Sequence, residues 1–145
     1  MSDPKFLEKL EDYNKRLQKL YECGGKDKID KQHSNGKLTA RERIEYLVDE
    51  GSFEEVDIFV KHRSTNFDLD KKQFPYDGVV TGFGKVNGKK IAIFSQDFTV
   101  QGGSLGEMHA KKIIKIQDLA MKYGCLLYTS DAADDLLCVY IGGRR

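Results

Sequence analysis

An apolar segment, a pair of glycines and a helical pattern follow one another between residues 94 and 112. After Gly102-Gly103 the apolar residues recur every three or four positions, as on one face of a helix. Ser104 and Glu107 have the spacing of a capping box, in which a hydroxyl and a carboxylate each accept a free backbone N–H. We therefore predict a helix over residues 105–123 that Ser104 caps. Its predicted buried face comprises Leu105, Met108, the stem of Lys112, Ile113, Ile116, Leu119, Ala120 and Tyr123.

A β-hairpin precedes this strand–helix step. Residues 79–86 and 89–94 read as strands, and Asn87-Gly88 between them supplies the positive φ angles of a type I′ turn. The hairpin glycines resemble a dinucleotide-binding fingerprint only in outline, because the last of them lies in the turn and opens no helix. A helix that crosses over a sheet leads to a parallel strand, so such a strand is expected after residue 124.

Two helices are predicted before the hairpin. The first runs from Asp3-Pro4 to Gly24-Gly25, and its narrow apolar stripe suits either its own domain or a partner subunit. Residues 26–37 are polar and read as a loop, in which His33 is expected to face solvent. The second helix covers residues 39–50. The stripe of the first helix comprises Phe6, Leu10, Tyr13, Leu17 and Leu20.

The second predicted helix begins with a capping box formed by Thr39 and Glu42. It also carries Arg41 and Arg43, which are either contacts for an anionic ligand or charges on the helix surface. A short strand is expected over residues 56–60, where apolar residues alternate, and a long loop follows it up to residue 76.

Composition excludes several classes of function. The chain has 145 residues and a net charge of +1, and no basic block indicates nucleic acid as a partner. It contains no apolar run of about 18 residues and no N-terminal apolar signal core, so we expect a cytoplasmic protein. Cys23, Cys125 and Cys138 show no C-x-x-C spacing, and we expect no metal.

Several short blocks, taken in order, resemble the N-terminal part of the biotin-dependent acyl-CoA carboxyltransferase subunits. That family includes propionyl-CoA carboxylase β chains and methylmalonyl-CoA decarboxylase or carboxyltransferase subunits. The order and spacing of the blocks make the resemblance specific. The blocks are Gly36-Lys-Leu-Thr-Ala-Arg-Glu-Arg-Ile44, Gly51-Ser-Phe53, His62-Arg63, Phe74-Pro75, Asp77-Gly-Val-Val-Thr-Gly82, Asn87-Gly88, Gln96-Asp-Phe-Thr-Val100 and Gly102-Gly-Ser-Leu-Gly-Glu107.

The resemblance implies an α/β, crotonase-like fold and an enzyme that moves a carboxyl group between carboxybiotin and an acyl-CoA of the propionyl or methylmalonyl class. It implies biotin on a partner carrier protein, a biotin carboxylase or a membrane decarboxylase subunit as partner, and a homo-oligomer in which N-terminal and C-terminal halves meet. An enolate held by backbone N–H groups is the expected intermediate. The alternatives are a decarboxylase subunit of a sodium-pumping complex and a non-catalytic assembly module.

Gly102, Gly103 and Ser104 are the candidate substrate-binding residues, because they open a helix beside the implied acyl-CoA path. The alternative is a strand–helix joint that needs no ligand. No catalytic residue is assigned, since the family's Asn-Asp-Ser-Gly-Gly-Ala-Arg motif is absent from this sequence. His109, within the predicted helix, is expected to be structural or on the surface.

The predicted organisation is N-terminal helices over residues 1–50, the start of a crotonase-like domain over residues 51–125, and a tail over residues 126–145. The tail does not resemble the family and reads as translated sequencing-adaptor read-through; a divergent or shortened family member is the alternative. Residues 126–128 could still supply the parallel strand. Without the later family elements we expect a chain that is marginally folded and inactive alone.

Overall fold

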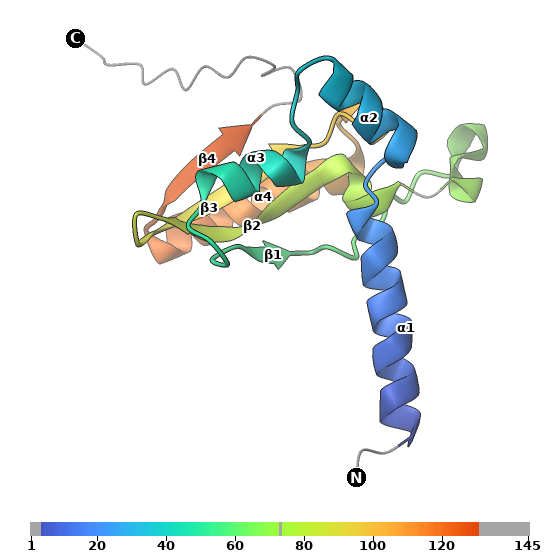
Figure 1. The fold of residues 1–145 in the computed structure, drawn as a ribbon, viewed down its shortest axis with the longest axis horizontal. Helices are drawn as coiled ribbons and strands as arrows, with labels where there is room; N and C mark the ends of the chain where they lie inside the picture. The colour runs from blue at the N-terminus through green and yellow to red at the C-terminus, as the bar shows by residue number, and fades with distance from the viewer. Residues whose placement is uncertain (1–3, 73, 131–145) are drawn as a thin grey trace.

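The computed structural model describes residues 4–72 and 74–130, which form a mixed α/β structure built on a four-stranded sheet (Figure 1). The first two strand pairs of the sheet are antiparallel and the third is parallel. The predicted hairpin and the predicted parallel strand are therefore both present. In sheet order the strands are β1 (Glu54–Val56), β2 (Val79–Val86), β3 (Lys89–Gln96) and β4 (Leu126–Ser130).

The tip of the hairpin is the predicted tight turn. Asn87 has φ 50° and Gly88 has φ 76°, the left-handed pair that a type I′ turn requires. The carboxylate of Asp49 accepts the backbone N–H of Asn87 at 2.9 Å and that of Gly88 at 2.8 Å. These two bonds tie the turn to the residues that follow helix α3 (Ala40–Leu47).

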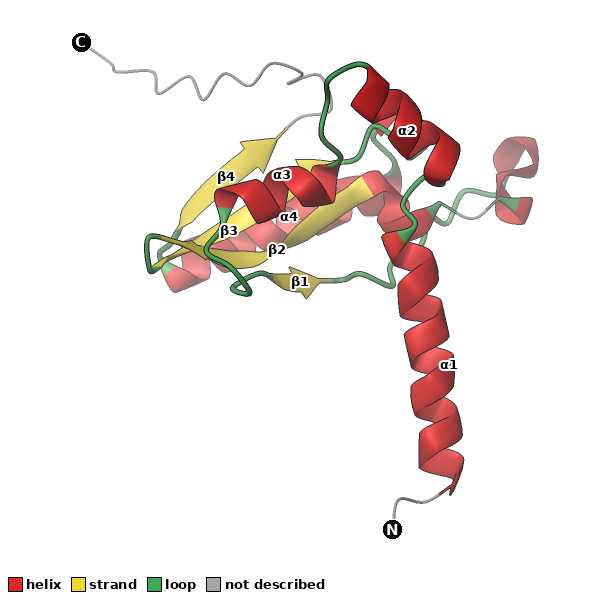
Figure 2. Cartoon of the chain, in the orientation of Figure 1, coloured by secondary structure: helices red, strands yellow, loops and turns green. Residues whose placement is uncertain are grey.

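Helices cover both faces of the sheet, with α3 on one face and α4 (Glu107–Tyr123) on the other (Figure 2). Side chains along a strand alternate between faces, so β2 and β3 each supply apolar residues to two cores. The core under α3 contains Ile44, Val80 and Ile93, and the core under α4 contains Phe83, Ala92 and Ile116. The capping box of Thr39 and Glu42 at the start of α3 is confirmed.

Two hairpin glycines allow segments to lie unusually close to β2. A Cβ on Gly82 would lie 2.4 Å from the carbonyl oxygen of Glu54 and 2.7 Å from the ring of Phe53, and one on Gly84 would lie 2.7 Å from Val48. Any side chain at these positions would push β1 and the end of α3 away from the sheet. The glycine spacing that superficially matches a nucleotide fingerprint thus serves packing.

The N-terminal region differs from the prediction in one helix. Residues 26–34, expected as a polar loop, form helix α2 (Lys26–Ser34). Gln32 is buried and Ile29 packs on the core, so tertiary contacts stabilise a segment whose composition alone indicated a loop. His33 lies in this helix and its Nε2 is 2.9 Å from a carboxylate oxygen of Glu42. Three short 3₁₀ segments lie further along: η1 (Asn66–Lys71), η2 (Pro75–Gly78) and η3 (Gln101–Gly103).

Helix α1 (Pro4–Tyr21) projects away from the sheet, with its C-terminal end at the body of the structure (Figure 1). Leu20 packs against the core under α3, whereas Phe6, at the other end of the predicted stripe, is 59% exposed. The stripe therefore meets the rest of the chain at Leu20 and, through Tyr13, at Phe59, whereas its N-terminal end is exposed.

The start of α4 contradicts the predicted cap. The helix begins at Glu107 rather than at residue 105, and the Ser104 hydroxyl donates to the carbonyl of Gln101 at 2.8 Å. The cap comes from Asp77, whose Oδ2 accepts the backbone N–H of His109 at 2.7 Å. The Glu107 carboxylate pairs with other side chains of the chain, Arg63 and Lys111.

The predicted buried face of α4 is also wrong at both ends. Leu105, which lies before the helix, is 64% exposed, and Tyr123 is 59% exposed. His109 is fully buried, because its spacing places it on the same helix face as Lys112, Ile116 and Ala120.

Lys112 of α4 is buried whole, including its amine. Its Nζ donates to the carbonyl of Val79 at 2.5 Å and to that of Tyr76 at 3.1 Å. Burial lowers the pKa of Lys112 to about 8, and the nearby carboxylates, Glu55 first among them, raise it only in part. The amine thus joins α4 to the backbone of η2 and of the first residue of β2.

We predict that Asp77→Ala lowers the free energy of unfolding by about 1–2 kcal/mol, because it removes the cap of α4. Asp77→Asn, which keeps an acceptor oxygen and tolerates the positive φ of this position, should recover more than half of the loss. Ser104→Ala is the matched control and should change stability by less than about 0.5 kcal/mol. Urea denaturation followed by circular dichroism measures all three; a larger loss for Ser104→Ala than for Asp77→Ala would restore the predicted cap.

A second prediction concerns pH. The pKa of Lys112 is about 8 in the folded chain and higher in the unfolded chain, so the unfolded state binds more protons between the two values and stability rises with pH there. Relative to Lys112→Met, the wild type should therefore gain on the order of 3 kcal/mol across this window.

The comparison with Lys112→Met isolates the lysine, because the raised pKa values of the buried Cys23 and Tyr76 affect the stability of both proteins. Lys122→Met removes an exposed lysine of the same helix and is the matched control for the loss of one lysine. Urea denaturation at fixed pH values measures these differences. A constant difference between wild type and Lys112→Met would contradict the lowered pKa.

Candidate functional site

The predicted joint at Gly102-Gly103 lies on the surface between β3 and α4. Gly102 has φ 64° and Gly103 has φ 75°, so the chain turns here through conformations that side chains disfavour. The N–H of Gly103 donates to Val100 at 3.0 Å and that of Ser104 to Gln101 at 3.3 Å. A Cβ on Gly102 would meet no atom within 4 Å, so its backbone faces open space. Gly102 is thus the part of the joint that a ligand can approach.

A buried carboxylate fixes the segment that leads to this joint. Asp97 Oδ1 accepts the backbone N–H of Thr99 at 2.8 Å and the Thr99 hydroxyl at 2.7 Å. Its Oδ2 accepts the hydroxyl of Tyr76 at 2.5 Å. Burial and the adjacent charge of Asp97 raise the pKa of Tyr76, so the phenol stays protonated and keeps donating. The loop between β3 and η3 is therefore held in one conformation.

The end of α1 is locked to the same loop. The backbone N–H of Gly24 donates to the Thr99 hydroxyl at 3.0 Å. A Cβ on Gly24 would lie 1.9 Å from the Thr99 carbonyl oxygen, a distance that excludes every side chain. The glycine predicted to end the first helix therefore also allows α1 to contact the candidate site.

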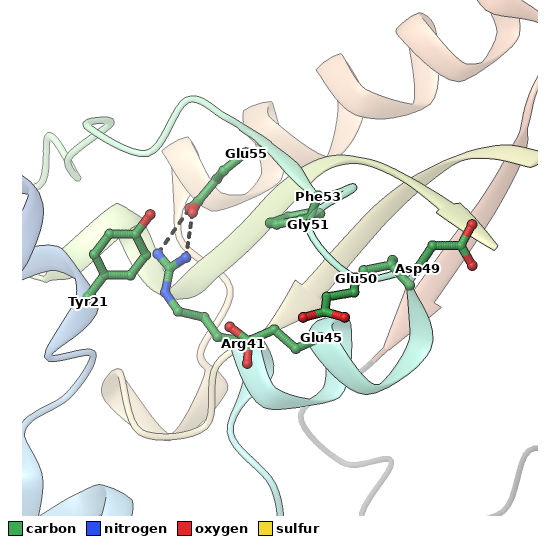
Figure 3. A pocket seen from close by; sticks show the side chains of 9 residues that line it. Tyr21, Arg41, Glu45, Asp49, Glu50, Gly51, Phe53 and Glu55 are labelled. Atoms are coloured by element: carbon green, nitrogen blue, oxygen red, sulfur yellow. Dashed lines mark hydrogen bonds and ion pairs between the residues drawn. The ribbon is translucent and has the colours of Figure 1, made fainter. Parts of the chain in front are cut away.

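Arg41 lies beside a cavity of about 490 Å³ that Figure 3 shows from close by. Its guanidinium makes two hydrogen bonds to the Glu55 carboxylate, one of them at 3.1 Å, and lies 4.6 Å from the ring centre of Tyr21. Burial alone would lower the pKa of Arg41, but the hydrogen bond and charge of Glu55 raise it. Carboxylates dominate the rest of the cavity wall, those of Glu45, Asp49, Glu50 and Glu55.

The guanidinium of Arg43 donates to the carbonyl of Gln96 at 2.6 Å, immediately before Asp97. Both candidate arginines thus have partners within the chain. Anion binding at Arg41 would require its pair with Glu55 to open, and at Arg43 it would compete with the bond to Gln96. The role of these two residues as anion contacts stays a prediction, as does substrate binding at Gly102, Gly103 and Ser104.

Sequence reasoning did not single out Tyr76, Asp97 or Thr99, although they position the joint. Asp97 and Thr99 lie inside one of the blocks that resemble the family, and Tyr76 lies between two of them, but a buried Asp–Tyr pair leaves no local pattern. His109 is buried, which agrees with a structural role. Across residues 4–72 and 74–130, no three or more His, Cys, Asp or Glu side chains gather as metal ligands, and no helix of that part is long and apolar enough to cross a membrane.

Sequence comparison gives close relatives that are much longer than this chain. It is 56% identical over 116 residues to methylmalonyl-CoA decarboxylase subunit alpha of Propionigenium modestum, covering 80% of this chain and 22% of the relative. It is 55% identical over 120 residues to a propionyl-CoA carboxylase beta chain of Saccharopolyspora erythraea, covering 82% of this chain and 22% of that protein. The chain therefore spans about a fifth of the length of these relatives.

Comparison with solved structures agrees with the sequence comparison. Transcarboxylase 12S, solved as a hexamer with methylmalonyl-coenzyme A and methylmalonic acid bound, superposes with a TM-score of 0.85 at 40% identity, covering 92% of this chain and 26% of that one. The predicted fold class is confirmed, because the structural neighbours are carboxyltransferases with the crotonase fold. The predicted domain limits stay predictions, and most of the predicted tail lies outside the described residues.

The matched family is described as the carboxyl transferase domain, and its model covers residues 31–133. That range contains the hairpin, the Gly102 joint, α4 and β4. The chain therefore belongs to the carboxyl transferase domain family, a family of carboxyltransferase and decarboxylase enzymes.

Proposed function

We propose that this chain forms the N-terminal part of an acyl-CoA carboxyltransferase and supplies one wall of its acyl-CoA site. The reaction would move a carboxyl group between carboxybiotin and an acyl-CoA of the propionyl or methylmalonyl class. The observation that carries the proposal is the superposition on transcarboxylase 12S, a protein solved with methylmalonyl-coenzyme A bound. The sequence identity to propionyl-CoA carboxylase beta chains supports the same substrate class.

The geometry supports a positioning role for this chain in that reaction. An enolate formed from a thioester carries its charge on oxygen, and fixed N–H donors stabilise such a charge by about 3–4 kcal/mol each. Gly102 lies in open space at the start of the segment that leads into α4, and the Asp97 bonds hold the preceding loop. Gly102 would therefore present its backbone to the acyl-CoA without needing to move.

Biotin would be carried by a partner protein and would supply or accept the carboxyl group. The partner that charges or empties it would be a biotin carboxylase or a membrane decarboxylase subunit, and the assembly would be a homo-oligomer in the cytoplasm. The named relatives include both carboxylase and decarboxylase subunits, which share the transfer step. Which of the two directions applies depends on the partner and not on the residues of this chain.

A chimera tests the proposal. Residues 4–124 of this chain would replace the corresponding segment of the Saccharopolyspora erythraea propionyl-CoA carboxylase beta chain, to which the chain is 55% identical. Carboxyl transfer from methylmalonyl-CoA to free biotin should stay within roughly tenfold of the parent, a change of about 1.4 kcal/mol in the barrier. A folded chimera of parental oligomer size with no transfer would overturn the proposal.

Two glycine substitutions in the chimera then test the joint. Gly102→Ala should lower kcat/KM roughly tenfold, because the added methyl group stands where the ligand approaches the backbone. Gly36→Ala is the matched control: it has φ 74°, it too faces open space, and it therefore carries the same backbone strain away from the joint. Equal effects of the two substitutions would show that strain alone is responsible and would remove Gly102 from the site.

A further inference from the structure

Arg41 of α3 contacts three elements that are distant from it in the sequence. Its guanidinium is hydrogen-bonded to the carboxylate of Glu55 in β1 and lies over the ring of Tyr21, the last residue of α1, at 4.6 Å from the ring centre (Figure 3). It also lies 4.9 Å from the ring centre of Tyr76 in η2. A single side chain of α3 therefore joins α1, β1 and η2.

The setting of Arg41 fits an internal contact better than a surface charge or an anion site. Its side chain is 12% exposed and that of Glu55 is 9% exposed. An anion would have to displace Glu55, and the cavity beside Arg41 carries three further carboxylates that would repel it. A planar guanidinium bonds a carboxylate with its edge while its faces meet aromatic rings, which an ammonium group cannot do. The contacts therefore require arginine rather than lysine.

Tyr76 leads from Arg41 to the Gly102 joint. The Tyr76 side chain is fully buried, and its hydroxyl donates to Asp97, which in turn accepts the backbone N–H and the hydroxyl of Thr99. Tyr76 has φ 42°, a conformation that a tyrosine keeps only when surrounding contacts hold it. The contact with Arg41 is one of these, so a change at Arg41 reaches the loop before Gly102.

Tyr21 gives a second route to the same loop. It lies three residues before Gly24, whose backbone N–H donates to the Thr99 hydroxyl at 3.0 Å. That hydroxyl also donates to Asp97, which η2 holds. The two residues bonded to the Thr99 hydroxyl are thus each held by a segment that Arg41 contacts.

We propose that Arg41 is a positioning residue of the acyl-CoA site, which holds η2 and the end of α1 so that the Gly102 joint keeps the conformation that meets the substrate. This inference rests on the proposed function. The joint would act on the charge that develops on the thioester oxygen, and Arg41 would not touch the acyl-CoA. Loss of the side chain should therefore lower kcat and leave KM nearly unchanged, whereas loss of a ground-state anion contact would raise KM.

Hydrogen exchange in the full chain tests the physical link without an assay of activity. Arg41→Lys keeps a positive charge beside Glu55, so the buried carboxylate stays compensated and the chain can fold. The amides of Thr99 and Gly103 should exchange roughly tenfold faster in this variant, whereas those of the central strands β2 and β3 should not change. Unchanged exchange at both loop amides, or equal acceleration in the strands, would overturn the proposal.

The chimera tests the consequence for catalysis. Arg41→Ala should lower kcat for carboxyl transfer roughly tenfold, about 1.4 kcal/mol in the barrier, and change KM for methylmalonyl-CoA less than about twofold. Where Arg41→Ala does not fold, Arg41→Lys takes its place. The matched control is Arg16→Ala, which removes an arginine that is also paired with a carboxylate but is exposed on α1, and it should leave both constants unchanged. An unchanged kcat, or a raised KM at unchanged kcat, would overturn the proposal.

Chemical rescue separates positioning from a general loss of structure. The cavity of about 490 Å³ beside Arg41 gives small ions access to the space left in Arg41→Ala. Millimolar guanidinium chloride should restore most of the lost kcat, because the free ion can bond Glu55 and stack on the two tyrosine rings. Urea has a similar planar shape without the charge, and methylammonium has the charge without the plane, so neither should rescue. Rescue by all three compounds, or by none, would contradict a role of the guanidinium group.

The two kinds of measurement keep this failure distinct from a failure of the proposed function. If a folded chimera transfers nothing but Arg41→Lys still accelerates exchange of the loop amides, the proposed function fails and the link from Arg41 to the loop stands. If the chimera is active and Arg41→Lys changes neither amide exchange nor kcat, the proposed function stands and the positioning role is refuted.

Discussion

A buried carboxylate, that of Asp97, is the interaction on which the arrangement around the Gly102 joint depends. An unpartnered charge in this position would cost several kcal/mol, and here three hydrogen bonds from Tyr76 and Thr99 satisfy it. Through Thr99 the same group fixes Gly24 at the end of α1. The end of one helix, the segment before the hairpin and the loop after it are therefore positioned by one side chain.

Helix α4 extends this arrangement because it is joined to η2 at two levels. Asp77 of η2 caps its first turn, and Lys112 one turn later donates back to the carbonyls of Tyr76 and Val79. Tyr76 and Asp77 both have positive φ, a conformation that costs about 1–2 kcal/mol per residue away from glycine. The contacts with α4 and Asp97 offset this strain. Neither η2 nor the start of α4 is therefore formed by its own sequence alone.

Elements formed by neighbouring residues could be predicted from the sequence, and elements formed by distant contacts could not. The Asn87-Gly88 turn, the Thr39 capping box and the strand that follows α4 depend on neighbouring residues or on the chirality of a crossover, and all three were predicted. Helix α2 and the cap of α4 depend on residues distant in the chain, and both were missed. Ser104 and Glu107 show the difference: they have the spacing of a capping box, but it is Asp77 that accepts the backbone N–H of His109 in the first turn of α4.

The same distinction holds for the candidate site and its surroundings. The glycine pair marked the joint, because a positive φ at the end of a strand leaves a signature in composition. The cavity between α1 and the segment around Phe59 left none, since its two walls come from segments far apart in the sequence. Only the structure brings Tyr13 to Phe59. The resemblance indicated the family correctly but carried no information about this surface.

The contact between Gly24 and Thr99 makes the end of α1 a pivot point, because the rest of the helix projects away from it. The helix has 18 residues and is therefore about 27 Å long, with its fulcrum at the Gly24 end. A rotation of roughly ten degrees about that fulcrum would move the N-terminal end by about 5 Å but would hardly move the last turn. The last turn of α1 is therefore positioned by the Gly24 contact, whereas the position of Lys9 would change with any rotation about that contact.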